Sequence, residues 1–333
     1  MSTLSSKTIP SAKIEAVRDH LLLWWHANRR DLPWRHTRDP YRVLVSEVML
    51  QQTQVERVIP YYERWLQEFP TVQALAAAPT AEVIRLWAGL GYNRRAVNLQ
   101  RTAQAVVDRG GTFPQTVGEL QELPGIGPYT SGAIACFAFE QDVPFIDTNM
   151  RRVLHRVLVG VDVPDILLND KGITELAALV LPPGSGWDWN QGLIEFGALQ
   201  CTARKPLCII CPMQDICAAW PDIQTAIAQQ PRGRKVSREV PFKESNRYFR
   251  GRVVDLLRDR DRAHTGLTLD EIGPLVRAEF QEADLPWLFE VVRGLEKDGL
   301  AMVAEDEPVY DAASSESAAA EPIDLGSVRI RLP

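Results

Sequence analysis

Four of the five cysteines lie close together in the sequence, at Cys201, Cys208, Cys211 and Cys217. Their spacing is C-x6-C-x2-C-x5-C, and four thiolates in one compact loop can surround a metal cluster or a single zinc ion. Zinc sites usually divide their ligands into two separated pairs, whereas one unbroken, unevenly spaced run favours a [4Fe–4S] cluster. The fifth cysteine, Cys136, lies in the apolar run AIACFAF and is predicted to be a small buried hydrophobe.

The rest of the chain is consistent with a cytoplasmic protein. Its first twenty residues lack the apolar stretch of a secretory signal, and no apolar run approaches the roughly 20 residues of a membrane span. Clustered cysteines in such a chain indicate metal ligation, not disulfides. The 333 residues suffice for two domains. A net charge of −6 gives no overall support for nucleic-acid binding, although the distribution of charge matters more than its sum.

Helical periodicity dominates the first 230 residues, where alternating extended runs are almost absent. One apolar stripe includes Ile14, Leu21 and Trp25. Thr80 and Thr116 precede two predicted helices as capping residues. We expect nine to eleven short helices, joined by turns that contain glycine and proline.

The composition changes after Cys217. Residues 223–249 are predicted to form a basic linker, and residues 231–262 contain eleven Lys and Arg against five Asp and Glu. That stretch could add affinity for a phosphate backbone or simply be solvated. In residues 250–333 we expect helices over 250–260, 269–280 and 286–297, and strands in LAMVAE and SVRIRL around a loop at 312–321. This pattern favours a small winged-helix-like C-terminal domain.

Three features of the helical region carry candidate chemistry. Residues 123–130 read LPGIGPYT, in which Gly125 and Gly127 allow tight φ values and let helical N–H groups approach a phosphate. An ordinary turn would explain this stretch equally well. Asp147 precedes a helix and by itself indicates an N-cap. Glu47, in the apolar stretch VLVSEVML, is either a partly exposed glutamate or a desolvated acid with a raised pKa.

The hairpin, the aspartate and the cysteines occur in the order typical of helix-hairpin-helix DNA glycosylases, and the chain resembles their endonuclease III and MutY group. The segments DLPWR, PY and SEVMLQQTQ within residues 31–54 resemble the MutY, or adenine glycosylase, branch almost residue for residue. Thr148 and the segment NRYFRGRVVDLLR resemble short actinobacterial-type members, which lack a clear nucleotide-hydrolase-like C-terminal domain. The resemblance covers roughly residues 12–222.

The resemblance implies a mainly α, two-lobed glycosylase core over 1–222, with DNA bound between the lobes, the hairpin on one lobe and the iron–sulfur loop (201–217) on the other. Glu47 would protonate adenine N7, Asp147 would stabilise positive charge on the sugar, and Asn149 would support Asp147. Tyr129 occupies the position where bifunctional members carry a lysine nucleophile. Because a phenol forms no imine, a monofunctional enzyme is implied.

The resemblance also implies contacts with DNA. Arg35 would contact the extruded base, and Tyr92 in GLGY would enter the base stack. The remaining contacts would be made near the opposite purine or to the backbone, by Gln51, Gln52, Thr53, Gly125, Gly127, Arg204 and Lys205. The plainer alternatives are an ion pair for Arg35, a core position for Tyr92 and a solvated helix end for the Gln-Gln-Thr run.

Together these features predict a monomeric base excision repair enzyme that removes adenine opposite 8-oxoguanine or guanine from double-stranded DNA, with no membrane association. A thymine or uracil mismatch glycosylase of the same fold is the first alternative. A non-catalytic iron–sulfur DNA-binding or redox-sensing protein is the second, but the presence of both Glu47 and Asp147 argues against it. A winged-helix regulator would explain only the C-terminal segment.

Overall fold

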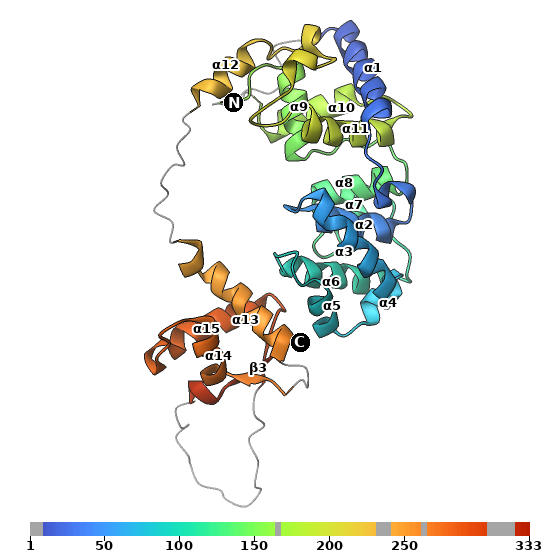
Figure 1. Ribbon diagram of the computed structural model, residues 1–333. Coiled ribbons are helices and arrows are strands. Elements are labelled where there is room, and N and C mark those ends of the chain that lie inside the picture. The colour runs from blue at the N-terminus through green and yellow to red at the C-terminus, as the bar shows by residue number, and fades with distance from the viewer. Residues whose placement is uncertain (1–8, 164–167, 231–240, 261–264, 305–323) are drawn as a thin grey trace, which may run out of the picture. The chain divides into compact units, whose positions relative to one another are not determined.

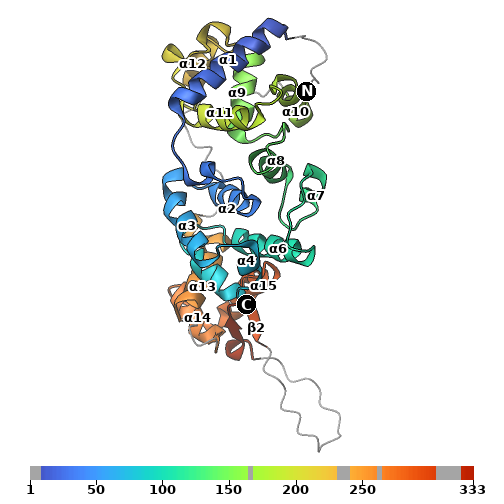
Figure 2. The ribbon, with the colours of Figure 1, turned by 90° about the vertical axis from the view of Figure 1, so that its right-hand side faces the viewer.

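The computed structural model describes residues 9–163, 168–230, 241–260, 265–304 and 324–333. The secondary structure is mainly helical, with one small sheet (Figures 1 and 2). The chain divides into two compact units, Met1–Gln51 with Phe113–Lys235 and Gln52–Thr112 with Val236–Pro333. Each unit therefore combines segments that are distant in the sequence.

The first unit contains the N-terminal helices, the hairpin and the cysteine loop. Its α-helices are α1 (Ser11–Asn28), α2 (Pro40–Leu50), α7 (Val117–Gln121), α8 (Pro128–Phe137), α9 (Thr148–Leu158), α10 (Asp170–Val180), α11 (Gly186–Leu199) and α12 (Asp222–Gln229).

The core of the first unit is centred on α1 and α11. The predicted stripe of α1 is buried at Ile14, Val17, Leu21 and Trp25. Gly192 of α11 faces this stripe, since a Cβ atom there would lie 3.3 Å from the Cβ of Trp25. The absence of a side chain at this position lets the two helices pack closely.

The second unit combines helices from the middle of the chain with the C-terminal elements. Its elements are α3 (Val55–Glu68), α4 (Val72–Ala77), α5 (Thr80–Leu86), α6 (Arg94–Asp108), α13 (Asn246–Arg260), β1 (Leu267–Thr268), α14 (Leu269–Val276), α15 (Leu285–Lys297), β2 (Met302–Ala304) and β3 (Arg329–Arg331).

The C-terminal elements share one apolar core with α5 and α6. Ile84 and Val97 of these helices lie in the same cluster of buried side chains as Val253, Leu257 and Leu288. The three strands form an antiparallel sheet in the order β1-β3-β2, and the central Ile330 of β3 is buried in the same cluster. Burial of each such side chain stabilises the unit by about 1.5–3 kcal/mol.

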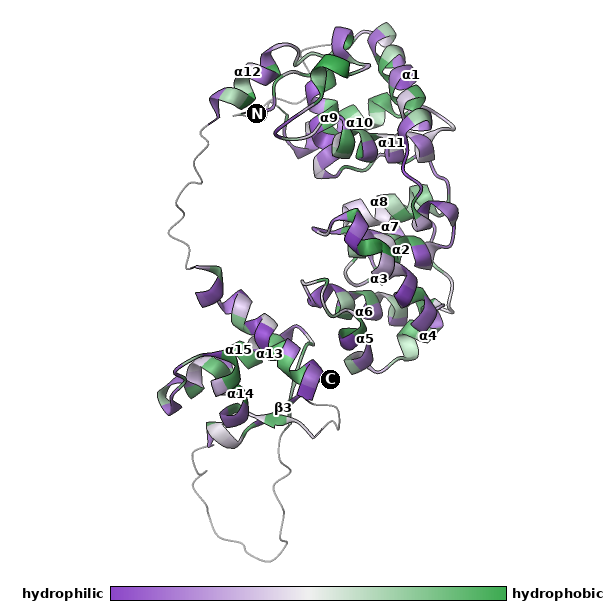
Figure 3. Cartoon of the chain, in the orientation of Figure 1, coloured by the Kyte–Doolittle hydropathy of each residue, from purple (hydrophilic) through white to green (hydrophobic). Residues whose placement is uncertain are grey.

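Figure 3 shows hydrophobic and hydrophilic residues interspersed along the helices of both units, as expected for amphipathic helices. Among the described residues, no helix is both long enough and apolar enough to cross a membrane.

Several expectations for the first 230 residues need correction. The described part of this region contains twelve α-helices, more than expected, and the six residues of α4 are too few to show a helical period. Thr116 caps α7 as predicted, but Thr80 lies inside α5, whose N-cap is Pro79. The hairpin and the cysteine loop lie in the same compact unit, not in different lobes, since α8 packs against α11 as well as α2.

The C-terminal expectations were partly wrong as well. The segment predicted as a linker contains most of α12, and α13 already begins at Asn246. Helix α14 ends at Val276, four residues before the expected end, where Phe280 packs over Gly273. The sheet has a third strand, β1, which is too short to recognise from alternation. The predicted loop at 312–321 lies outside the described residues.

Candidate active site

Glu47 is a buried carboxyl group on α2. This helix begins at Pro40, and the side chain of its N-cap, Asp39, accepts a hydrogen bond from the Tyr41 amide at 2.9 Å. Most residues of α2 are buried, and Glu47 is only 6% exposed. The sequence alternative of a partly exposed glutamate is therefore wrong.

Tyr129 is the hydrogen-bond partner of Glu47. Its hydroxyl group donates to Oε2 of Glu47 at 2.8 Å from the first turn of α8. The ring is held by an edge-to-face contact with Phe145, at a centroid distance of 5.5 Å. Burial first, and then the nearby carboxyl groups, raise the pKa of Tyr129 well above its usual value, so the hydroxyl keeps its proton.

Asp147 is the N-cap of α9 and also lies within electrostatic range of Glu47. Its Oδ1 accepts from the Met150 amide at 2.6 Å, and its Oδ2 accepts from Nδ2 of Asn149 at 3.3 Å. Oδ1 of Asn149 in turn accepts from Arg152 at 2.8 Å. The cap predicted from sequence is thus present, and Asn149 orients the carboxyl group.

The two carboxyl groups differ in their tendency to ionise. Burial raises the pKa of Glu47 to about 7; the Tyr129 hydrogen bond opposes this shift, and the charge of Asp147 adds to it. Burial also raises the pKa of Asp147, against the effect of hydrogen bonds from two backbone amides. Glu47 can therefore be either protonated or ionised near neutral pH.

Arg35 lies nearby in an ion-pair network. Its side chain is 7% exposed, and Nη2 lies 3.0 Å from Oε2 of the fully buried Glu195. Nε donates to Gln191 at 3.0 Å, and the guanidinium group lies over the Trp25 ring. Burial alone would raise the pKa of Glu195, but hydrogen bonds from Arg30 and Arg35 lower it to about 2. The ion-pair alternative for Arg35 is therefore observed, although the pair is buried.

The two hairpin glycines have different roles. Gly125 has a φ of 82°, in the left-handed region that glycine adopts without strain. Gly127, the N-cap of α8, has a φ of −94°, and no atom lies within 4 Å of the position of an added Cβ. The expectation of a tight φ is therefore correct for Gly125 and wrong for Gly127.

The Gln-Gln-Thr run follows α2 directly. Gln51 is the C-cap of α2, and Gln52 has a left-handed φ of 55°, which is uncommon for a residue with a side chain. Both glutamines are exposed. In the second unit, the hydroxyl group of Thr53 accepts a hydrogen bond from Arg95 at 3.4 Å.

Tyr92 lies in a strained turn of the second unit. The residue has a φ of 45° and follows two glycines with positive φ, Gly89 and Gly91. Its side chain is 45% exposed, so the alternative of a core position is wrong.

The four cysteines of the loop interact electrostatically. Burial raises the pKa of Cys201, Cys217 and Cys211, the last to about 11, and other thiols of the loop add to the shift in each case. No group of three or more His, Cys, Asp or Glu among the described residues is already arranged to hold a metal ion. The thiols of Cys201, Cys208 and Cys217 all lie within electrostatic range of Cys211, so the four cysteines are gathered in one loop.

Two arginines of α9 support the cysteine loop. Arg156 of α9 lies 3.9 Å from Sγ of Cys201 and donates to the carbonyl groups of Thr202 and Ala203. Arg152 donates to the carbonyl group of Cys201 at 2.7 Å. Such donors and cations stabilise thiolates, as cluster binding requires.

Residues 45–164 match the family described as HhH-GPD superfamily base excision DNA repair protein, and residues 201–217 match the iron-sulfur binding domain of endonuclease III. Adenine DNA glycosylase of Mycolicibacterium smegmatis is 40% identical over 254 residues, which cover 76% of this chain and 84% of that protein. The chain belongs to the adenine DNA glycosylase family. The Mycobacterium tuberculosis protein of the same name is 36% identical over 274 residues.

Not all members of the adenine DNA glycosylase family match over their full length. The mouse protein is 46% identical over 224 residues, but the match covers only 43% of it, so the chain spans less than half the length of the mammalian relatives. Among solved structures, a thermostable thymine-DNA glycosylase is similar with a TM-score of 0.59 and 33% identity, over 64% of this chain and 97% of that one.

The sequence analysis did not identify several residues that hold the site and the cysteine loop in place. Glu195 lies in an otherwise apolar helical stretch, and only its distant partners, Arg30 and Arg35, explain its burial. The sequence gives only a weak indication of a shared role for Arg152 and Arg156, namely that arginines four residues apart lie on one face of a helix. The structure brings Glu47, Tyr129, Asp147 and Asn149 into one site.

Proposed function

We propose that this chain is a monofunctional adenine DNA glycosylase that removes adenine opposite 8-oxoguanine or guanine in double-stranded DNA. The observation that carries this proposal is the buried Glu47, hydrogen-bonded to Tyr129 and influenced by Asp147, with a pKa of about 7. A carboxyl group with such a pKa can give and take a proton at neutral pH.

In the proposed reaction, Glu47 donates its proton to N7 of adenine. The bond between C1′ and N9 breaks, its electron pair leaves with the base, and positive charge develops on the sugar. Ionised Asp147 stabilises that charge, while Asn149 and the Met150 amide hold the carboxylate in place. Water then adds to C1′, and its proton passes to the carboxylate of Glu47.

Tyr129 supports the assignment of a monofunctional enzyme. A phenol that keeps its proton forms no imine with the sugar, so base loss is not followed by strand cleavage. Its hydrogen bond instead fixes the position of the Glu47 carboxyl group.

We propose DNA contacts for residues of both units. Arg35 reaches the extruded base, and Tyr92 enters the base stack, where an aromatic ring replaces lost stacking. The exposed Gln51 and Gln52, with Thr53, meet the opposite purine. Backbone contacts with phosphate are proposed for Gly125, Gly127, Arg204 and Lys205, and the last two are exposed cations within the cysteine loop.

The proposed cofactor is a [4Fe–4S] cluster held by Cys201, Cys208, Cys211 and Cys217. When bound, it shapes the loop and takes no part in breaking the glycosidic bond. The uneven cysteine spacing and the supporting arginines of α9 favour this assignment.

The proposed organisation is a monomer with a glycosylase core over 1–222, a basic connection over 223–249 and a winged-helix-like domain over 250–333. The connection includes most of α12. Three helices with a three-stranded antiparallel sheet support the last assignment.

The second candidate is a thymine or uracil mismatch glycosylase. The similarity to a thermostable thymine-DNA glycosylase, at 33% identity over 97% of that chain, is the observation that favours it. The carboxyl groups would serve either reaction, so the substrate must be determined directly.

Single-turnover excision from duplexes containing A:8-oxoG, A:G, T:G or U:G tests the proposal. Adenine release, with strand breaks appearing only after alkali, is the expected result. Release of thymine or uracil instead would support the second candidate. Absence of base release from every duplex would contradict both and favour a non-catalytic DNA-binding protein.

A further inference from the structure

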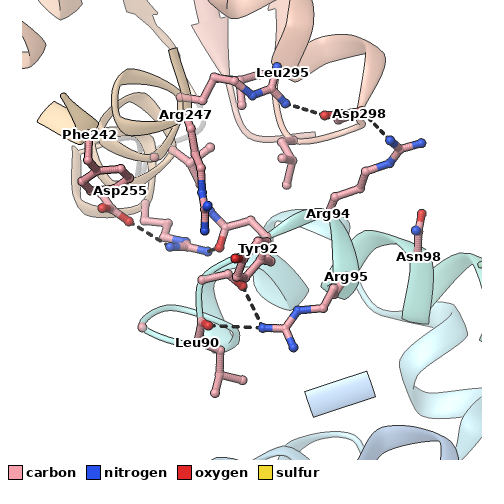
Figure 4. A pocket seen from close by; sticks show the side chains of 18 residues that line it. Leu90, Tyr92, Arg94, Arg95, Asn98, Phe242, Arg247, Asp255, Leu295 and Asp298 are labelled. Atoms are coloured by element: carbon pink, nitrogen blue, oxygen red, sulfur yellow. Dashed lines mark hydrogen bonds and ion pairs between the residues drawn. The ribbon is translucent and has the colours of Figure 1, made fainter. Parts of the chain in front are cut away.

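Two distant segments of the second unit surround Tyr92 (Figure 4). Arg247 of α13 places its guanidinium carbon 4.4 Å from the centroid of the Tyr92 ring. Arg95 of α6 lies 5.5 Å from the same centroid. An exposed aromatic ring in the middle of the chain therefore contacts a cation from the C-terminal elements.

The turn that carries Tyr92 is held in one conformation. A left-handed φ at a residue with a side chain costs of order 1–3 kcal/mol and persists where the surroundings enforce it. Arg95 of α6 enforces this conformation, because its Nη2 donates to the carbonyl groups of Leu90 and Gly91 at 3.2 Å each. Tyr92 is therefore presented by a fixed backbone.

Helix α13 is anchored to the same turn by Arg258, which is only 8% exposed. Its Nε donates to the carbonyl group of Ile84 at 3.0 Å, and Nη2 donates to Oδ1 of Asn93 at 2.9 Å. Asn93 directly follows Tyr92. The position of Arg247 on α13 is thus fixed relative to Tyr92 by buried hydrogen bonds at the other end of the same helix.

The surrounding pocket, with a volume of about 650 Å³, carries excess positive charge. Its charged lining residues are Arg94, Arg95, Arg247, Arg250, Arg258, Asp255 and Asp298. Asp298 pairs with Arg94 and Arg250, and Asp255 pairs with Arg258. Within the described part of the chain, Arg247 forms no ion pair with a carboxylate, so this exposed cation can bind an external anion.

We propose that Arg247 of α13 contacts a backbone phosphate of double-stranded DNA beside the bases that Tyr92 meets. The C-terminal elements are then part of the DNA-binding surface. This inference rests on the proposed function, which makes duplex DNA the substrate.

Duplex DNA fits this surface better than a small anion does. A phosphate ion would engage Arg247 but would make no use of the exposed ring of Tyr92. DNA offers a phosphate and a base face a few ångströms apart, which matches a guanidinium group next to an aromatic ring. For a chain with a net charge of −6, binding to DNA must rely on such local positive surfaces.

The test compares Arg247→Ala with Arg260→Ala, a matched control that removes an exposed arginine from the same helix but outside the pocket. The probe is a duplex containing a non-cleavable 2′-fluoro-deoxyadenosine opposite 8-oxoguanine. Its Kd is measured by fluorescence anisotropy at several salt concentrations from about 50 to 200 mM.

We expect Arg247→Ala to reduce the slope of log Kd against log salt by about 0.9 and to weaken binding about fivefold near 0.15 M salt. Arg260→Ala should keep the wild-type slope, and Arg247→Lys should retain most of it, because a cation remains. Equal slopes for wild type and Arg247→Ala would overturn the inference. Equal losses of DNA affinity in Arg247→Ala and Arg260→Ala would overturn it as well.

A double-mutant cycle tests whether Arg247 acts together with Tyr92. If they bind one DNA site jointly, the losses of affinity in Tyr92→Ala and Arg247→Ala are not additive, whereas those in Tyr92→Ala and Arg260→Ala are. Wild-type base release is measured in parallel. Release of thymine in place of adenine would refute the proposed function but leave the comparison of salt slopes interpretable.

Discussion

Glu47 shows how opposing contacts set the behaviour of a single residue. Burial favours the neutral acid, whereas the hydrogen bond from Tyr129 favours the carboxylate, and the resulting pKa is about 7. A fully solvated glutamate would lose its proton below neutral pH. A glutamate buried without the hydrogen bond would keep its proton to a pH well above neutrality. The Tyr129 hydrogen bond therefore helps to keep the pKa of Glu47 close to neutral pH.

In the proposed reaction Glu47 acts in its protonated form, so the rate of adenine release should fall as the pH rises through about 7. Tyr129→Phe removes the hydrogen bond that lowers the pKa of Glu47, so this decline should move to higher pH. Single-turnover rates measured across neutral pH give the shift. Tyr248→Phe, in the second unit, is the control, and an unmoved profile in Tyr129→Phe would contradict the role of the phenol.

Glu47 should also reduce the stability of the folded protein at high pH. Its pKa is raised from 4.5 to about 7 on folding, so both states are neutral below 4.5 and the full cost of burying the carboxylate applies above 7. Glu47→Gln should therefore increase the free energy of unfolding by about 3 kcal/mol at alkaline pH. Denaturant unfolding at several pH values measures this gain, which should disappear below pH 4.5. A gain independent of pH would contradict the assignment.

At the scale of elements, α9 connects the active site to the cysteine loop. Its N-cap is Asp147, and Arg152 joins Asn149 of the site to the carbonyl group of Cys201. Arg156, one turn later, holds the next two residues of the loop. One helix thus orients the Asp147 carboxyl group at its start and the cysteine loop along its side.

Arg156→Met should reduce the amount of cluster bound per chain. It removes the hydrogen bonds of a buried arginine to the carbonyl groups of Thr202 and Ala203, and it leaves Asp162 without its ion-pair partner. Breaking a buried ion pair in this way costs about 3–5 kcal/mol. Iron and sulfide content with visible absorbance measures the loss. Arg151→Met is the control, because Arg151 lies on α9 like Arg156 but pairs with the exposed Asp170 of α10. Equal iron content in the two variants would show that Arg156 does not support the loop.

The sequence was most informative where chemistry depends on short stretches. Glu47, Asp147 and the four cysteines each lie in a local motif, and their residue types limit what they can do. Glu195 and Arg258 could not be predicted, because their partners lie 160 and 174 residues away, at Arg35 and Ile84. Strand β1 was missed for a different reason, since two residues cannot show an alternating pattern.

At the scale of the whole molecule, the described C-terminal elements share their apolar core with α5 and α6. Their apolar residues form one cluster with Ala81, Ile84 and Val97 of α5 and α6. Stability should therefore be shared between segments that the sequence assigned to separate domains, because a common core unfolds cooperatively.

Leu257→Ala should make α5 and α6 exchange their amide hydrogens faster, together with α13. Leu257 is completely buried in the shared cluster, and its truncation costs about 2–5 kcal/mol. Native-state hydrogen exchange followed by peptide analysis measures the effect. Leu23→Ala, at an exposed position of α1, should change exchange little anywhere. If only α13, α14 and α15 responded to Leu257→Ala, the C-terminal segment would fold independently. Faster exchange in α5 and α6 would instead mean that a perturbation of the C-terminal core reaches the turn that presents Tyr92.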